Sequence, residues 1–379
     1  MKEQRFKDFV EECYGTQKRK NLSKAKMEGW FDEITTEITM EQLKKAIKEA
    51  PNDSAAGPSQ IGNRVIKMLD DEVLEEVRGL FNQCLEEGMV PDSINNALMK
   101  LLPKTESGLD DMNKVRPITL MENILKIFER IIIGRITETL VKHKVLDPDQ
   151  FGGLPGSGVN APLRILAETI EDANASGQEL HLLITDLAKA FDGLEYWSQE
   201  LSWDCIGMPE NITKLLVNID RGNTDREGGG ATTQVGLAQG YTTEPFRHGR
   251  GVRQGSVGGP LKWCIFVHFW LQWVKSKMKG KGYRMSNGKT TTPIDKSLMG
   301  EEHHPESAEV NGMKFIDDAT WPVASLPALQ ELVVMHETFC EFHEVTLHKG
   351  KSERASINYK GPDIVNIRWA AEGRRSRGK

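Results

Sequence analysis

Apolar residues recur along the first half of the chain at the three-to-four-residue spacing of amphipathic helices. Thr39 and Gln42 have the pattern of a capping box, and Pro51 ends the helix that they begin. A second apolar stripe predicts a helix over residues 71–87, ended by Gly88. The same reasoning predicts further helices over residues 122–142, 160–173, 209–221, 260–278 and 326–343.

Short apolar runs between these helices predict strands. Extended segments are expected over residues 97–102 and 115–120, and glycine-punctuated alternation over residues 232–246 predicts a hairpin. A buried-type strand over residues 182–185 leads to Asp186, and another apolar run leads into the 317–318 acid pair. Together these segments predict an α+β fold.

Composition narrows the class of protein. The chain has 379 residues, 38% of them hydrophobic and 27% charged, which is typical of a soluble globular protein with two or three domains. Its net charge of -6 argues against a strongly basic nucleic-acid binder, although a basic groove is compatible with an acidic total.

The sequence also excludes several kinds of site. The five cysteines are isolated, so neither a zinc site nor a disulfide framework is indicated. The most apolar run, residues 264–274, is too short to span a membrane, and the charged N-terminus lacks a signal peptide. We therefore expect no membrane partner and an intracellular location, nuclear or cytoplasmic.

The candidate chemistry lies in three carboxylates. Asp186 follows one apolar strand, and the adjacent Asp317 and Asp318 follow another. If the two strands pair side by side, the acids converge at one sheet edge and suit Mg²⁺, which prefers hard oxygen ligands. Two such ions support nucleotidyl transfer. The alternative is a solvated Asp-Asp turn and two unrelated strand ends.

Eight short motifs occur in a fixed order across roughly residues 36–355. They are Ala56-Gly57-Pro58, Leu102-Pro103-Lys104, Arg116-Pro117-Ile118, Asp149 to Gly152, Asp186 to Asp192, Gly251 to Ser256, Phe315 to Ala319, and Leu347 to Ser352. In content and order the chain resembles the reverse transcriptase domain of non-LTR (LINE-type) retrotransposons. Group II intron-type maturases share the palm. The residues at Gly251–Gly255 and Lys189–Asp192, however, resemble the LINE type more closely.

The resemblance implies a role for each matching residue. Asp186 and Asp317 would bind two Mg²⁺ ions, with Asp318 as the third catalytic carboxylate. Lys351 matches a lysine that protonates the leaving pyrophosphate; its alternative is a solvated loop lysine. Asp192 is expected to be structural.

Three further positions would bind the nucleotide. Arg116 would contact the base or triphosphate with its forked guanidinium, or else is a surface charge before a proline. Gln254, with Gly255, would contact the sugar and template, or else is an ordinary turn residue. Phe191 would be a steric gate that excludes a ribose 2′-hydroxyl and so selects dNTPs; its alternative is a core phenylalanine.

The implied architecture is a right-hand polymerase palm and fingers with the thumb largely missing. We expect a lead-in over residues 1–35, fingers interleaved with palm over 36–180, palm over 181–355 and a basic tail over 356–379. The implied function is RNA-directed DNA synthesis, with an RNA template, a DNA primer or target DNA, and dNTPs as partners.

Two other functions stay open on the sequence. The chain is short for its family and departs from the family pattern at Gly156-Ser157-Gly158, Gly258-Gly259-Pro260 and His348. It is therefore either an active core or an inactive truncated remnant that binds only RNA or a protein partner. An RNA-dependent RNA polymerase with a similar palm is the third hypothesis, against which Phe191 argues.

Overall fold

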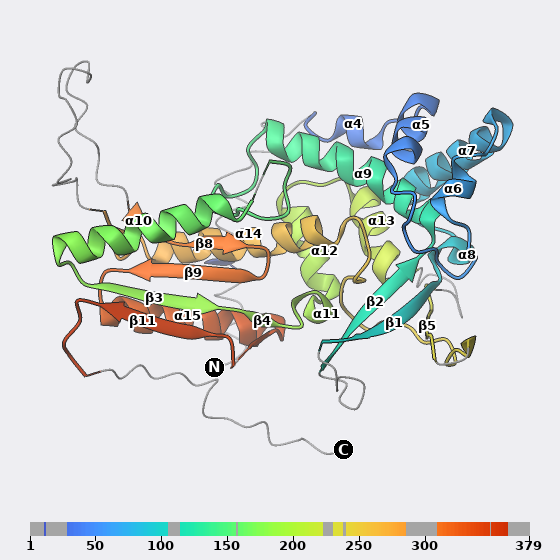
Figure 1. Cartoon of the computed structure of the whole chain (residues 1–379). Helices are drawn as coiled ribbons and strands as arrows, with labels where there is room; N and C mark the ends of the chain where they lie inside the picture. Colours follow the sequence, from blue (N-terminus) through green and yellow to red (C-terminus); the bar gives the residue numbers. More distant parts are fainter. Residues whose placement is uncertain are drawn as a thin grey trace. The chain divides into compact units, whose positions relative to one another are not determined.

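The computed structural model describes residues 11–12, 29–104, 114–156, 158–222, 230–237, 240–285, 309–348 and 350–362. Helices and sheets are mixed along the chain, as the sequence predicts (Figure 1). The chain divides into two compact units. The first unit comprises Met1–Leu146 and Phe191–Phe266, and the second comprises Asp147–Ala190 and Val267–Lys379.

Helices of the first unit begin and end where local signals place them. Thr39 caps α5 (Met40–Glu49) through the complete capping box with Gln42. Asp70 caps α7 (Asp71–Glu87), which ends at the left-handed Gly88. Helix α5 packs against the largely buried α9 (Asn123–Lys142) and against α7. The remaining helices are α4 (Asp32–Thr35), α6 (Asn63–Ile66), α8 (Asp92–Asn95), α12 (Tyr196–Cys205) and α13 (Glu210–Arg221).

The first unit also contains a three-stranded sheet in the order β2-β1-β5. The β1 strand (Ala97–Pro103) pairs antiparallel with β2 (Val115–Met121) and parallel with β5 (Thr233–Val235). The sequence predicts a hairpin over residues 232–246, but β5 in this segment also pairs with β1. Antiparallel bridges join Thr233 to Phe246 and Gly236 to Thr242, but the strand itself extends the β1–β2 sheet.

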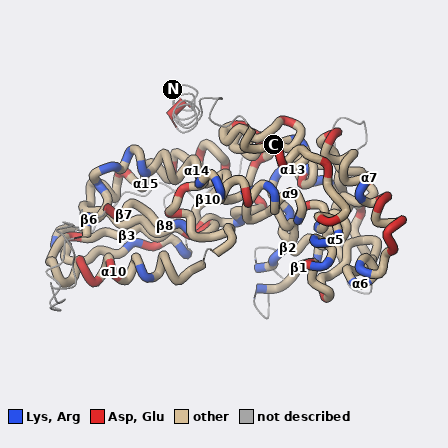
Figure 2. Tube along the Cα trace, turned by 90° about the horizontal axis from the view of Figure 1, so that it is seen from above, with Lys and Arg blue, Asp and Glu red and all other residues tan. Residues whose placement is uncertain are grey.

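The second unit is built on an antiparallel four-stranded sheet. Its order is β11-β3-β9-β8, from strands Glu353–Ile357, Leu180–Thr185, Asp318–Val323 and Met313–Phe315. Helix α10 (Asn160–Ser176) lies on one side of this sheet and α15 (Leu326–His343) on the other (Figure 2). Two-stranded ladders join β4 (Leu187–Ala188) to β10 (Thr346–Leu347) and β6 (Tyr283–Arg284) to β7 (Glu309–Val310).

Aromatic packing fills the space between the sheet and α15. Trp270 stacks on Phe339 with ring centroids 4.6 Å apart and meets Trp321 of β9 at 5.6 Å. Trp270 comes from α14 (Gly259–Lys277), one of two helices within which the chain passes between units; the other is α11 (Ala190–Gly193). Strand β9 is an interior strand because it pairs with both β3 and β8, and the aromatic contacts bury its Trp321 side chain.

Most predicted elements are confirmed to within a few residues, but α12, β9, β11 and several shorter elements were not anticipated. Helix α12 escaped prediction because buried polar side chains, including Ser198, Gln199 and Ser202, interrupt its apolar pattern. Strand β11 lies in a segment that the sequence leaves unassigned. Apart from residues 11–12, the expected lead-in before residue 29 lies outside the described residues, as does the tail after residue 362. None of the described helices is long and apolar enough to cross a membrane.

Candidate active site

Strand pairing in the second unit brings the acids together. The register places Thr185, the last residue of β3, opposite Ala319 of β9. Asp186 follows the end of one strand and Asp318 begins the other, so antiparallel pairing puts both at the same edge. The sequence anticipated the convergence but chose the wrong neighbour, because the strand ending at Phe315 pairs with β9 rather than β3.

A tight hairpin turn joins β8 to β9 and carries Asp317. Phe315 pairs with Asp318, so Ile316 and Asp317 are the two turn residues. Ile316 adopts φ 56°, in the left-handed region that favours glycine and that a β-branched side chain rarely enters. Such strain persists only where the surroundings hold the backbone in place.

The loop over residues 149–152 supplies that support. Lys314 N–H donates to the Asp149 carbonyl at 2.9 Å, and Phe151 N–H donates to the Lys314 carbonyl at 2.7 Å. A Cβ atom at Gly152 would lie only 2.9 Å from the Ile316 backbone nitrogen. Gly152 is therefore required for close approach to the acidic turn, which explains a motif that the sequence could not interpret.

Three residues near the end of the described chain, His348, Lys351 and Ser352, contact Asp186. His348 N–H donates to the Asp186 carbonyl at 2.8 Å, and Asp186 N–H donates to Ser352 Oγ at 3.3 Å. Lys351 Nζ forms an ion pair with Asp186 Oδ2 at 2.9 Å. Lys351 is an exposed loop lysine that also contacts the candidate catalytic carboxylate directly.

The charges at this edge interact. Burial, followed by the carboxylates of Asp317 and Asp186, raises the pKa of Asp318 above its ordinary value. The hydrogen bond to Asp186 raises the pKa of Lys351. Three negative groups and one exchangeable ammonium therefore share one region, which favours a bound cation.

The donor set fits a hard divalent cation by its chemistry, since carboxylate oxygens are the ligands that Mg²⁺ prefers. The ammonium of Lys351 occupies a cation position on Asp186. Among the residues that the structure describes, no group of three or more His, Cys, Asp or Glu side chains is already arranged around a common metal position.

The candidate nucleotide residues lie in the first unit, where contacts join two of the motifs to Thr119, the residue that follows a third. Thr119 N–H donates to the Gln254 carbonyl at 2.7 Å, and Gln254 Nε2 donates to Asp192 Oδ1 at 3.0 Å. Gly255 is exposed, with φ 147°, and a Cβ atom there would lie 2.1 Å from the Thr119 carbonyl oxygen. Only glycine fits this position.

Phe191 lies next to the same loop. Its carbonyl accepts from Val252 N–H at 2.8 Å, and its half-buried ring lies 5.7 Å from that of Trp263. A Cβ atom on Gly259 would lie 3.7 Å from the ring. The side chain is therefore packed on one side and partly accessible.

Arg116 lies at the exposed end of the β1–β2 hairpin, opposite Leu102. Lys104 N–H donates to the Lys114 carbonyl at 2.8 Å, so that two more basic residues share this end. Lys100 is exposed on the same strand pair, and Figure 2 shows basic residues along it. The hairpin end is suited to a polyanion.

Sequence reasoning missed a group of buried charges in the first unit. They are Glu129, Asp220, Arg253 and Lys262, each at most 4% exposed. The available signal was a charged residue inside an apolar run, as at Glu129 in α9 and Lys262 in α14. Without tertiary contacts that signal does not reveal which charges meet.

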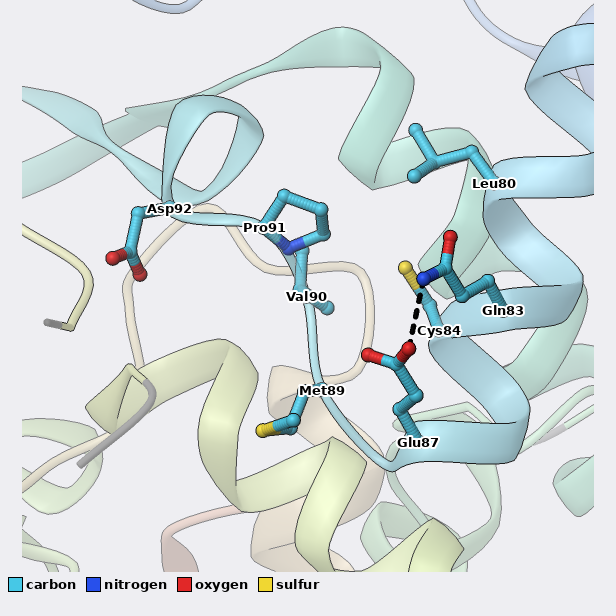
Figure 3. Close-up of a pocket in the computed structure, with 8 residues that line it drawn as sticks. All are labelled: Leu80, Gln83, Cys84, Glu87, Met89, Val90, Pro91 and Asp92. Carbon is cyan, nitrogen blue, oxygen red and sulfur yellow. Dashed lines mark hydrogen bonds between the residues drawn. The ribbon is translucent and has the colours of Figure 1, made fainter. Parts of the chain in front are cut away.

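A small cavity of about 130 Å³ lies elsewhere in the first unit (Figure 3). Its lining comes from α7 and the segment that follows it, and Gln83 Nε2 donates to Glu87 Oε1 at 2.8 Å within it. Burial raises the pKa of the adjacent Cys84 thiol to about 12, so the thiol is unreactive at neutral pH. None of the residues lining it belongs to the eight motifs.

Comparison with known proteins agrees with the motif order. Residues 102–364 match the family described as reverse transcriptase (RNA-dependent DNA polymerase). The chain is 25% identical over 235 residues to the RNA-directed DNA polymerase from mobile element jockey of Drosophila melanogaster, covering 61% of this chain and 24% of that protein.

Two R2 relatives have similar sequence identity to this chain. The Pol polyprotein of the type-1 retrotransposable element R2 of Nasonia vitripennis is 27% identical over 238 residues, covering 63% of this chain and 21% of that protein. Its counterpart from Bradysia coprophila is 29% identical over 199 residues, covering 52% and 22%. The chain thus spans about a quarter of the length of these curated relatives. Because the family match covers more than half of its residues, the chain belongs to the reverse transcriptase (RNA-dependent DNA polymerase) family.

Proposed function

We propose that this chain is the RNA-directed DNA polymerase core of a non-LTR retroelement. It adds dNTPs to the 3′-hydroxyl of a DNA primer or nicked target DNA, directed by an RNA template. The observation that carries the proposal is the pairing of β3 with β9, which sets Asp186 beside the Asp317-Asp318 turn in a chain of this family.

The second unit would carry the chemistry. Asp186 and Asp317 would hold Mg²⁺ with Asp318 as the third carboxylate, and the pair of ions would activate the primer hydroxyl and neutralise the leaving pyrophosphate. Lys351, protonated at neutral pH, would then transfer a proton to the pyrophosphate from Nζ. Its place on Asp186 keeps that ammonium at the carboxylate edge.

The first unit would bind the nucleotide. Arg116 and its basic neighbours on the hairpin would contact the triphosphate, while Gln254 and Gly255 would contact the sugar and template. The partly accessible face of Phe191 would exclude a 2′-hydroxyl. In this assignment residues 36–180 form fingers interleaved with palm, residues 181–355 form the palm, and residues 1–35 and 356–379 flank them.

A primer-extension assay tests the proposal. Wild-type protein with an RNA template, DNA primer, dNTPs and Mg²⁺ should extend the primer. Asp186→Ala and Asp317→Ala should lower the rate at least roughly a hundredfold, because each removes several kcal/mol of transition-state stabilisation. The exposed Asp204→Ala serves as the control that should leave the rate unchanged.

Two outcomes would contradict the proposal. Equal incorporation by wild type and both variants would show that these acids are not catalytic. Tight binding of template-primer by the wild type without any incorporation would instead identify a non-catalytic remnant.

A further inference from the structure

Two buried carboxylates hold the two sides of the loop that carries Gln254 and Gly255. On one side, Arg253 N–H donates to Asp220 Oδ1 at 3.2 Å. On the other, Ser256 Oγ donates to Glu129 Oε1 at 2.6 Å, and Val257 N–H donates to Glu129 Oε2 at 3.1 Å. The half-buried Gln254 and the exposed Gly255 thus lie between two anchored residues.

The carboxylates belong to one charge-balanced group. Lys262 Nζ contacts Asp220 Oδ2 at 2.6 Å, with both side chains fully buried, and also donates to the Leu216 carbonyl at 2.8 Å. The Arg253 guanidinium donates to the Asn95 carbonyl at 2.7 Å. Lys262 also interacts electrostatically with Glu129, and Arg253 with both acids, so the two acids and two cations form one buried group.

Such a group is not explained by stability alone. Burying ions costs desolvation energy, and well-packed apolar residues of similar volume are often equally or more stabilising. The loop above, however, needs restraint, since Gly251 and Gly255 both have positive φ, at 98° and 147°. Directional bonds to buried acids restrain a backbone better than apolar packing does.

We propose that Glu129 and Asp220 are positioning residues that clamp both ends of the Gln254-Gly255 segment and thereby set the affinity for the incoming nucleotide. This inference rests on the proposed function, because it assumes that Gln254 and Gly255 contact the nucleotide. The carboxylates themselves do not contact it; they act through the loop backbone and Ser256.

The test uses a matched pair of substitutions. Ser256 Oγ and Val257 N–H donate to different oxygens of Glu129, so in Glu129→Gln one of the two donors meets an NH2 group instead of an acceptor. Glu122→Gln is the control, because Glu122 is also buried and accepts from the Ser59 hydroxyl and from Ser59 N–H at 2.8 Å, and Ser59 is not part of this loop. Ser256→Ala and Ser59→Ala form a second, milder pair.

Two measurements are made on each variant. Steady-state primer extension should give a roughly tenfold higher KM for dNTP in Glu129→Gln, with kcat within about threefold of wild type, since one hydrogen bond to a charged group is lost. Hydrogen exchange should be faster at the backbone amides of residues 252–257. Ser256→Ala should also raise the KM for dNTP and the amide exchange rate of the loop. The Glu122 and Ser59 variants should change neither the KM nor the exchange rate.

The outcomes separate this inference from the proposed function. An unchanged KM and unchanged loop exchange in Glu129→Gln and Ser256→Ala would overturn the clamp while primer extension by the wild type continued. An equal rise of KM in the Glu122 control would overturn it too, since general loss of stability would then explain the effect. A wild-type chain that extends no primer would contradict the proposed function and, with it, the nucleotide role of the clamp.

Discussion

Two lysine–aspartate pairs, one in each unit, have nearly the same length but different surroundings. Lys262 and Asp220 are 2.6 Å apart with both side chains fully buried. Lys351 and Asp186 are 2.9 Å apart, but the lysine side chain is 64% exposed. The first pair is fixed within the interior, whereas the second joins an exposed lysine to a carboxylate whose side chain is only 10% exposed.

The difference separates a structural ion pair from an exchangeable one. Opening the buried pair strands a charge in a medium of low dielectric constant, so the pair persists in every functional state. Opening the second pair returns the exposed Lys351 ammonium to water, so the lysine side of this pair costs little. Asp186 is therefore proposed to exchange the ammonium for another cation, while Asp220 stays bonded to Lys262 and to the Arg253 N–H.

The largest effect is expected from breaking the buried pair. Lys262→Met should lower the free energy of unfolding by about 3–5 kcal/mol, because Asp220 is left buried without its cation. Equilibrium urea unfolding measures this loss. The double variant Lys262→Met with Asp220→Leu should regain much of the lost free energy of unfolding. A Lys262→Met variant as stable as wild type would contradict the view that the buried pair is structural.

The next effect concerns the loop that the buried pair supports. Gly255→Ala should destabilise the loop by about 1–3 kcal/mol, because the new Cβ would overlap the Thr119 carbonyl and the φ of 147° disfavours alanine. We expect kcat/KM for dNTP to fall at least roughly tenfold. Gly158→Ala is the matched control, since no atom lies within 4 Å of its Cβ position.

A third prediction concerns the sugar. Phe191→Ala should raise the use of rNTPs relative to dNTPs by roughly 10- to 100-fold, because removal of the ring opens space worth about 1–3 kcal/mol of discrimination. Competitive incorporation of a ribo- and a deoxyribonucleotide opposite one template base measures the ratio. Unchanged selectivity would assign Phe191 to the core alone, through its packing against Trp263.

The smallest effect is expected at the exposed pair. Lys351→Met should lower the free energy of unfolding by no more than about 1 kcal/mol near neutral pH. The hydrogen bond with Asp186 raises the pKa of Lys351, so this contribution is complete below the ordinary lysine value of about 10.4 and disappears as pH rises through the raised pKa. Urea unfolding between pH 7 and pH 11 should show the two proteins converging. A difference that widened with pH would contradict the pairing.

Local signals predicted much of the fold. The capping box at Thr39 and Gln42 and the apolar stripe of residues 71–87 each specify a helix without help from distant residues. Asp186 and the Asp317-Asp318 pair were recognisable because both follow apolar runs, and the hairpin turn at Ile316 brings them to one edge. For these three acids, the local apolar pattern and the order of the motifs predicted the same candidate site.

The rest depended on contacts between distant residues. Glu129 meets Ser256 across 127 positions, and Lys262 meets Asp220 across 42, so neither pairing has a local signature. Gly152 is explained only by its approach to Ile316. The sequence therefore predicted the residues proposed to act in chemistry better than the residues that hold them in place.

The central claim is that the carboxylates at the β3–β9 edge catalyse nucleotide addition. Single-turnover incorporation of one dNTP by Asp186→Asn tests it most directly, since the isosteric amide preserves shape while removing the charge. The account predicts a rate constant at least roughly a hundredfold below wild type, with template-primer affinity changed less than about threefold. A rate constant equal to that of wild type would contradict it.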